Sequence, residues 1–155
     1  MRVRLLTVSG RPPAWAEAAF REYAKRLPPA LKFTAPRIPL ARGHARDARR
    51  AMAGEGARLL AALTPEETVV ALDERGESWT TTVLARRLKS WQMSRRDVAF
   101  LVGGPDGLAP ACRERADLAW SLSALTLPHA LVRVLVAEQL YRAVSLNAGH
   151  PYHRA

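Results

Sequence analysis

Short apolar runs alternate along the chain with segments in which apolar residues recur at helical spacing. Val3–Val8, Thr68–Leu72 and Val98–Val102 are nearly continuous apolar runs, which is typical of strands buried on both faces of a parallel sheet. Weaker strands are expected at Lys32–Ile38, which prolines interrupt, and at Leu118–Leu122. This alternation predicts the α/β class, with a mainly parallel sheet flanked by helices.

Helical segments are expected between these strands. Two prolines open the first, Ala14–Leu27, and proline is favoured in the first turn of a helix. The other helices are expected at Asp47–Leu63, at Thr80–Trp91, over a short stretch from Pro110 and at Leu131–Leu146, and Asp73–Ser78 is expected to be a polar turn. The chain shows no internal repeat, low-complexity segment or linker, so we expect one domain over residues 1–155.

Composition narrows the class of partner. With 155 residues and 48% hydrophobic content the chain can bury a core, and its net charge of +10 favours a nucleic acid partner. No apolar run is long enough to span a membrane, no segment has the pattern of a signal peptide, and the single cysteine allows no intrachain disulfide. We therefore expect a cytoplasmic protein without a membrane partner.

The segment Gly103–Gly107 (GGPDG) follows a predicted buried strand and precedes a predicted helix. Ligands of open α/β sheets bind beyond the carboxyl ends of strands, and glycine allows a ligand to approach the backbone closely. A turn that simply requires positive φ explains the segment equally well. The first strand is followed by no GxGxxG, and the chain has no GxxxxGK[ST], which disfavours a dinucleotide enzyme and a P-loop ATPase.

The loop Ser121–His129 (SLSALTLPH) carries small, hydroxylated and apolar residues. Its backbone groups could line a pocket for a neutral ring such as adenine, although a buried connection would have the same composition. His129 at its end could transfer protons near neutral pH, and an N-cap or packing role is at least as plausible.

The last helix and the tail after it carry a second group of candidates. The helix is apolar over much of its circumference, which is typical of a central helix or of one shared with another subunit. Glu138 and Arg142 have the spacing of an intrahelical ion pair, or of an arginine held toward a phosphate or base. The tail 148–155 combines two histidines, a tyrosine and an arginine, which suits RNA binding, while a frayed terminus is the alternative.

Cys112 has no paired base in the sequence, so we expect it to be structural. The four histidines and one cysteine show no metal-ligand spacing, so no metal is expected.

Four segments together are similar to one known family. They are GGPDGL (103–108), SLSALTLPH (121–129), LVRVLVAEQLYRA (131–143) and HPYHR (150–154). In this order and spacing they resemble the RlmH (YbeA-type) family of SPOUT-class methyltransferases, which modify N3 of a pseudouridine in helix 69 of 23S rRNA. The N-terminal segment 8–28 also looks like the first strand and helix of this family, so the resemblance covers nearly the whole chain.

The resemblance implies a SPOUT-type α/β fold with a trefoil knot, and a homodimer with the final helix in its interface. The knot and the cofactor, S-adenosylmethionine, would lie in about residues 100–147, and the substrate tail in 148–155. The implied cofactor residues are Leu72, Gly103, Gly104, Leu122, Ser123, Ala124, Leu125, Thr126, Leu127 and Pro128. The implied substrate-side residues are His129, Arg142, Tyr152, His153 and Arg154.

The resemblance leaves the proton acceptor and the substrate form open. His129 or His153 could take the imide proton, or water could take it while Arg142 or Arg154 stabilises the anion. We expect the assembled ribosome to be the substrate. The alternatives are a non-catalytic ribosome-binding factor with the same basic surface and a SPOUT methyltransferase of tRNA.

Overall fold

The computed structural model describes residues 1–154 and contains one five-stranded sheet of order β2-β1-β4-β3-β5. All four strand pairings are parallel, which confirms the predicted sheet. The strands are Val3–Val8 (β1), Arg37–Ile38 (β2), Thr68–Ser78 (β3), Val98–Val102 (β4) and Leu118–Ser121 (β5). Because the strands are parallel, all their carboxyl ends meet at one edge of the sheet, where ligands of such sheets bind.

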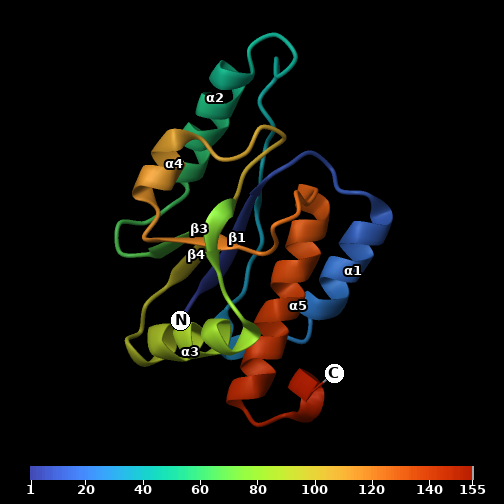
Figure 1. The fold of residues 1–155 in the computed structure, drawn as a ribbon, viewed down its shortest axis with the longest axis vertical. Helices are drawn as coiled ribbons and strands as arrows, with labels where there is room; N and C mark the ends of the chain where they lie inside the picture. The colour runs from blue at the N-terminus through green and yellow to red at the C-terminus, as the bar shows by residue number, and fades with distance from the viewer. Residues whose placement is uncertain (155) are drawn as a thin grey trace.

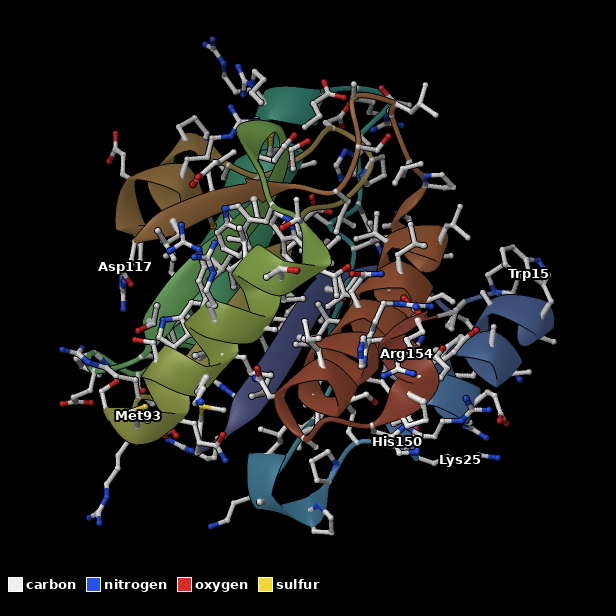
Figure 2. All side chains as sticks on the ribbon, turned by 60° about the horizontal axis from the view of Figure 1, so that its bottom comes forward. Trp15, Lys25, Met93, Asp117, His150 and Arg154 are labelled. Atoms are coloured by element: carbon white, nitrogen blue, oxygen red, sulfur yellow. The ribbon has the colours of Figure 1, made fainter. Side chains whose placement is uncertain are left out.

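Helices cover both faces of the sheet. They are Ala14–Ala24 (α1), Ala48–Ala61 (α2), Thr81–Met93 (α3), Pro110–Arg115 (α4) and His129–Asn147 (α5), with 3-10 turns at Pro29–Leu31 (η1) and Pro151–Arg154 (η2). The helices α1, α3 and α5 lie on one face, and α2 and α4 lie on the other (Figure 1). The 3-10 turn η2 packs against α5 near the C-terminal end of that helix. Figure 2 brings this end of the molecule forward, with His150 and Arg154 labelled.

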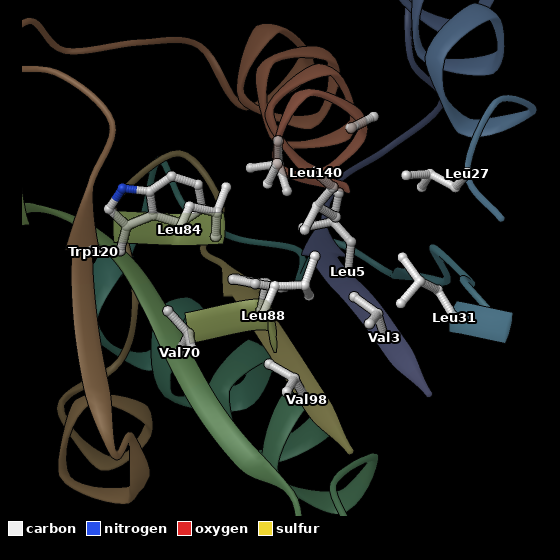
Figure 3. Packing of buried hydrophobic residues seen from close by; sticks show 14 of the residues in the cluster. Val3, Leu5, Leu27, Leu31, Val70, Leu84, Leu88, Val98, Trp120 and Leu140 are labelled. Atoms are coloured by element: carbon white, nitrogen blue, oxygen red, sulfur yellow. The ribbon is translucent and has the colours of Figure 1, made fainter. Parts of the chain in front are cut away.

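Alternating side chains of β1 divide the core into two layers. Val3 and Leu5 point toward α1, α3 and α5, where they pack with residues such as Leu140, whereas Leu6 and Val8 point toward α2 and α4 (Figure 3 shows the first layer). Each of these side chains is fully buried, as expected for strands in the centre of a parallel sheet. None of the helices in residues 1–154 combines the length and the apolarity needed to cross a bilayer.

The predicted turn at Asp73–Ser78 is wrong, because β3 continues through these residues. The register against β5 shifts between Leu72 and Glu77, both of which pair with Trp120. The extension pairs with the edge strand β5, and most of its side chains are exposed or only half-buried. It therefore lacks the apolar pattern by which a buried strand is recognised.

Other element ends also differ from the predictions. The strand predicted at Lys32–Ile38 is reduced to β2 and an isolated bridge of Thr34, because Lys32 has a positive φ of 42° and proline donates no ladder hydrogen bond. The first helix ends at Ala24 instead of Leu27, in turns that close three residues back. The last helix begins at His129, two residues before the predicted start. The trefoil knot stays a prediction.

Candidate active site

A cavity of about 610 Å³ lies at the carboxyl ends of β4 and β5, beside the middle of β3. Its walls come from residues 72–75 of β3, the ends of β4 and β5, the loops that follow these two strands, and the first turns of α5. The predicted cofactor residues that line it are Leu72, Gly103, Gly104, Leu122, Ser123, Leu125, Thr126, Leu127 and Pro128. Ala124 belongs to the same loop but does not line the wall. Residues from three separate parts of the sequence thus line one cavity.

The glycine loop after β4 is folded tightly back on itself. A Cβ added at Gly103 would lie 2.4 Å from the carbonyl carbon of Gly107, so no other residue fits there. The amide of Gly107 donates to the carbonyl of Gly104 at 3.0 Å, and Gly107 has a positive φ of 87°. The two readings of this segment, a strained turn and a ligand loop, are therefore compatible, because the turn itself forms part of the cavity.

The loop after β5 is held in place by its own hydroxyl groups. Ser121 donates to the carbonyl of Ser123 at 3.0 Å, and the Ser123 hydroxyl accepts the amide of Leu125 at 2.9 Å. Thr126 donates to the Glu74 carboxylate at 3.0 Å, which ties the loop to β3. This loop is not a buried connection, because Leu125 is 72% exposed at the cavity.

Charged side chains in the cavity are mainly acidic. The carboxylates of Asp73, Glu74 and Asp106 line it, against the guanidinium groups of Arg75 and Arg113. Arg113 pairs with Asp73 at 3.1 Å, which neutralises one charge of each sign and leaves a small excess of carboxylates in the lining. A cavity with this balance favours a cationic ligand over a phosphate.

Trp120 forms part of the cavity wall and was not predicted as a site residue. Its ring stacks on Trp79 with centroids 5.1 Å apart, and Arg87 lies 4.4 Å from the Trp79 centroid. The indole Nε1 of Trp120 is buried and has no hydrogen-bond partner within residues 1–154. In the sequence Trp120 is simply one large residue in a strand, so no local pattern singles it out.

His129 is the one predicted substrate-side residue on this cavity. His129 is the first residue of α5. The N-cap role considered for His129 from the sequence belongs instead to Pro128. Arg142 lies about 20 Å further along the same helix, given a rise of about 1.5 Å per residue. The predicted substrate-side residues are therefore divided between the two ends of α5.

The tail forms a compact cluster with the last turns of α5. Arg142 donates to Glu138 at 2.8 Å, and its guanidinium lies 4.8 Å from the ring centroid of Tyr152. The Tyr152 hydroxyl donates to Glu138 at 3.2 Å, and its ring packs on Tyr141. His153 is hydrogen-bonded to the carbonyl of His150. The tail is thus ordered and not frayed; Ala155 lies outside the described residues.

The electrostatics of this cluster follow from Glu138. Its carboxylate raises the pKa of Arg142 through their hydrogen bond. Burial raises the pKa of the Tyr152 phenol, and the nearby Glu138 charge raises it further. Tyr152 is therefore a neutral hydrogen-bond donor at physiological pH, and Arg142 is a fixed cation.

Cys112 is buried beside Gly56 and donates to its carbonyl at 3.5 Å. Burial raises the pKa of the thiol, which disfavours a nucleophilic thiolate and supports the structural role expected from the sequence. Within residues 1–154 the histidines, cysteine and carboxylates form no group of three suited to a metal ion.

The sequence interpretation also missed Glu55, which lies under the glycine loop. Its side chain is almost fully buried, and it accepts hydrogen bonds from the Ala41 amide at 3.0 Å and from His44 at 2.7 Å. A Cβ added at Gly104 would lie 3.0 Å from its Oε1. Ala51, Glu55 and Leu59 are spaced by four residues, so a carboxylate on the apolar face of this helix was a signal present in the sequence.

The outer surface of α5 is only partly covered. Its apolar band of Val132, Val136, Leu140 and Ala143 packs into the core of the same chain. Leu131 and Leu135, one turn apart on another face, are half-buried and belong to neither core layer. Two apolar side chains at this spacing leave a stripe that a second subunit could cover.

Comparisons with known proteins agree with the fold. A family model described as "Predicted SPOUT methyltransferase" matches residues 1–153. The chain is 58% identical over the full length of both chains to ribosomal RNA large subunit methyltransferase H of Alkalilimnicola ehrlichii, and 56% identical over 99% of both to that of Thioalkalivibrio sulfidiphilus.

Solved structures that are more distant in sequence share the fold. A probable methyltransferase from Bordetella pertussis Tohama I aligns with a TM-score of 0.59 and 19% identity, over 92% of this chain and 96% of that one. A structure from Legionella pneumophila that contains the bound cofactor SAM aligns with a TM-score of 0.53 and 9% identity, over 92% of this chain and 66% of that one. The chain therefore belongs to the SPOUT methyltransferase family, among the ribosomal RNA large subunit methyltransferase H proteins.

Proposed function

We propose that this protein transfers a methyl group from S-adenosylmethionine to N3 of a pseudouridine in helix 69 of 23S rRNA, on the assembled ribosome. The observation that carries the proposal is the cavity at the carboxyl ends of β4 and β5, beside the middle of β3. It gathers nearly all the predicted cofactor residues in a chain whose relatives, at 51–58% identity, are large subunit rRNA methyltransferases. The net charge of +10 suits an RNA substrate.

The cavity fits S-adenosylmethionine in size and in charge. Its volume of about 610 Å³ is within the range of small-molecule sites, and its excess of carboxylates favours a cationic ligand. The apolar loop after β5 and the glycines after β4 would hold the adenosine part, with the buried Trp120 Nε1 as an unused donor. When bound, this cofactor supplies a methyl group on a positively charged sulfur.

We propose further that the complete site forms between two subunits. Within one chain, Arg142 and the tail lie about 20 Å from His129, too far to reach one target base. If two α5 helices pack antiparallel through Leu131 and Leu135, the tail of one subunit reaches the cavity of the other. The homodimer thus supplies the substrate-side residues that a single chain holds apart.

The chain's own residues would then position the base and handle its proton. Loss of the N3 proton leaves an imide anion, and a base in place contributes roughly 10²–10⁴-fold in rate. His129 at the cavity or His153 in the partner tail is the candidate base. Alternatively water takes the proton, and Arg142 or Arg154 stabilises the anion. Tyr152 would position the base by stacking.

A methylation assay that compares substrates tests the proposal. We would incubate the enzyme and labelled cofactor with assembled ribosomes, free large subunits, naked 23S rRNA and bulk tRNA, and then identify the methylated nucleoside by mass spectrometry. We expect methyl transfer to N3 of pseudouridine on ribosomes and little on naked RNA. Transfer to tRNA alone would contradict the assignment and favour the tRNA alternative.

Calorimetry separates the enzyme from a non-catalytic ribosome-binding factor. The enzyme binds S-adenosylmethionine without RNA, because the cavity is already formed in the free chain. A binding factor with the same basic surface would associate with ribosomes in a salt-dependent way and release no heat with the cofactor.

A further inference from the structure

A second cavity, separate from the one described above, is lined mainly by arginines. It has a volume of about 440 Å³ and lies between the segment that enters α2 and the helix itself. Arg42, Arg46, Arg50 and Arg58 line it, against the single carboxylate of Asp47. In Figure 1 this segment forms the loop beyond α2, at the extremity of the molecule away from the C-terminal tail.

The guanidinium groups of this cavity lack carboxylate partners. Within residues 1–154, none of the four lies within 4.0 Å of a carboxylate oxygen, whereas Arg2, Arg4 and Arg142 elsewhere are paired. The Asp47 carboxylate instead caps α2 by accepting the amide of Arg50 at 3.0 Å. Four unneutralised positive charges around one hollow repel each other, so the cavity favours an anion.

The segment that carries these arginines is held in a fixed conformation. The carbonyl of Gly43, which has a positive φ of 92°, accepts the amides of Arg46 and Asp47 at 3.0 and 2.8 Å. Arg58 donates to the carbonyl of Pro39 at 3.0 Å, which fixes its direction. A backbone that is already ordered loses less entropy on binding than a flexible basic loop would.

One residue of the segment that carries these arginines also contacts the wall of the methyltransferase cavity. His44 contacts Asp106, on the wall of the methyltransferase cavity, and Glu55, under the glycine loop. An RNA backbone held at the arginines would therefore lie next to the end of the molecule where the cofactor cavity opens. Guanidinium groups bind phosphate oxygens bidentately, and RNA is the polyanion that this protein's family acts on.

We propose that Arg42, Arg46, Arg50 and Arg58 bind the phosphate backbone of the rRNA at a site separate from the target base. The site anchors the enzyme on RNA by charge, without reading sequence, and leaves the choice of the base to the reaction site. This inference rests on the proposed function for the identity of the RNA, but its physical content is the release of counterions when the arginines bind phosphates.

The test compares two variants that each lose three positive charges. One is Arg42→Gln/Arg46→Gln/Arg50→Gln. The control is Arg86→Gln/Arg95→Gln/Arg96→Gln, whose arginines are exposed and have no ion pair within residues 1–154. Binding to assembled ribosomes and to a plain RNA duplex is measured over a range of salt concentrations, with circular dichroism to verify folding. For the first variant we expect the negative slope of log affinity against log salt to become shallower by about 2 to 3.

The first variant should also bind RNA at least about tenfold more weakly at moderate salt, and the control should keep the wild-type slope. S-adenosylmethionine affinity should not change in either variant. Equal losses in both variants, or an unchanged slope in the first, would overturn the anchor. If the triple variant does not fold, the single change Arg46→Gln replaces it. For this change we expect the negative slope to become shallower by about 1. Absence of methyl transfer by the wild type would refute the proposed function alone, because the duplex measurement still tests the anchor.

Discussion

The two ends of the sheet differ in whether their buried polar side chains have hydrogen-bond partners. At the amino ends of the strands, Asp97 accepts both the amide and the Nε of Arg2, at 2.7 and 2.8 Å, and Glu67 is paired with Arg4. Toward the carboxyl ends, several buried polar atoms have no partner within residues 1–154: Thr7 Oγ1, Ser9 Oγ, Glu55 Oε1, Trp120 Nε1 and Arg133 Nη1. A sixth such atom, Arg87 Nε, lies on α3. Buried polar atoms are nearly always hydrogen-bonded, so such a concentration marks an end built to receive other groups.

From this difference we expect the amino ends of the strands, the satisfied end, to contribute mainly to stability, and the carboxyl ends, the open end, to contribute mainly to function. The satisfied end ties β1, β4 and the turn before β3 together through side chains. The open end combines a glycine loop, an apolar loop and unused donors around a cavity. The tail lies at the satisfied end, so the proposed role of the tail requires a second subunit that places it beside a cavity. Substitutions at the two ends should therefore change different measured quantities.

The largest effect is expected for Gly103→Leu at the open end. Its side chain would collide with the backbone of Gly107, so the loop cannot keep its shape. We expect S-adenosylmethionine binding to be lost and the methylation rate to fall by about 1,000-fold, since binding and alignment both fail. Gly54→Ala, where a Cβ meets nothing within 4 Å, is the control and should bind the cofactor normally. Cofactor binding by Gly103→Leu at the wild-type level would contradict the site.

A smaller loss is expected for Arg154→Ala at the tail. The methylation rate should fall by about 100-fold if, as we propose, this arginine stabilises negative charge that develops on the target base. Cofactor affinity should stay unchanged, because Arg154 is among the residues expected to act on the RNA and not among those expected to hold the cofactor. Single-turnover kinetics and calorimetry measure the two quantities. Lys25→Ala removes a charge from the same end of the molecule (Figure 2) and should leave both unchanged; a weaker cofactor affinity in Arg154→Ala would refute the division.

Stability should depend on Glu67 at the satisfied end. Its side chain is fully buried, and it accepts Arg4 Nε at 2.7 Å and the amide of Thr64 at 2.8 Å. Glu67→Gln breaks this pair and should lower the free energy of unfolding by about 3 kcal/mol in a denaturant titration. Glu66→Gln, on an exposed neighbour, should change it little. An equal effect of the two variants would show that the pair contributes no more than a surface charge.

The same carboxylate makes stability depend on acid. Burial alone would raise the pKa of Glu67, but the hydrogen bonds from Arg4 and Thr64 outweigh it and lower the pKa below 4.5. The stabilisation is present above the unfolded-state pKa and is lost as pH falls through the lowered value. The stability gap between wild type and Glu67→Gln should therefore close in acid. A gap that persists after full protonation would contradict this cause.

The smallest effect is expected from His44 at the open end. Its hydrogen bond to Glu55, and then that to Asp106, raises its pKa above 6.5. The stabilisation is complete below the unfolded-state value and is lost as pH rises through the raised pKa. The difference in unfolding free energy between wild type and His44→Gln should therefore shrink as pH rises from about 6 to about 9. A difference that grows with pH would contradict the contact.

The sheet was predictable because buried parallel strands leave continuous apolar runs, as in β1 and β4. The extension of β3 over 73–78 was not, because an exposed edge pairing needs no apolar side chain. The proposed cofactor residues followed from the resemblance, and the cavity brings together segments that share no sequence pattern. Glu55 was visible as a carboxylate on an apolar helix face, whereas its contact with His44 depends on how the basic segment folds.

The central claim is that the cavity of one subunit works with the tail of the other subunit. A mixed-dimer experiment tests this claim most directly. Gly103→Leu and Arg154→Ala chains are each expected to be nearly inactive on ribosomes. In a random mixture half of the dimers carry one intact cavity beside one intact tail, so roughly one quarter of wild-type activity should return. Activity no higher than that of the separate variants, in mixtures shown to contain mixed dimers, would contradict a site shared between subunits.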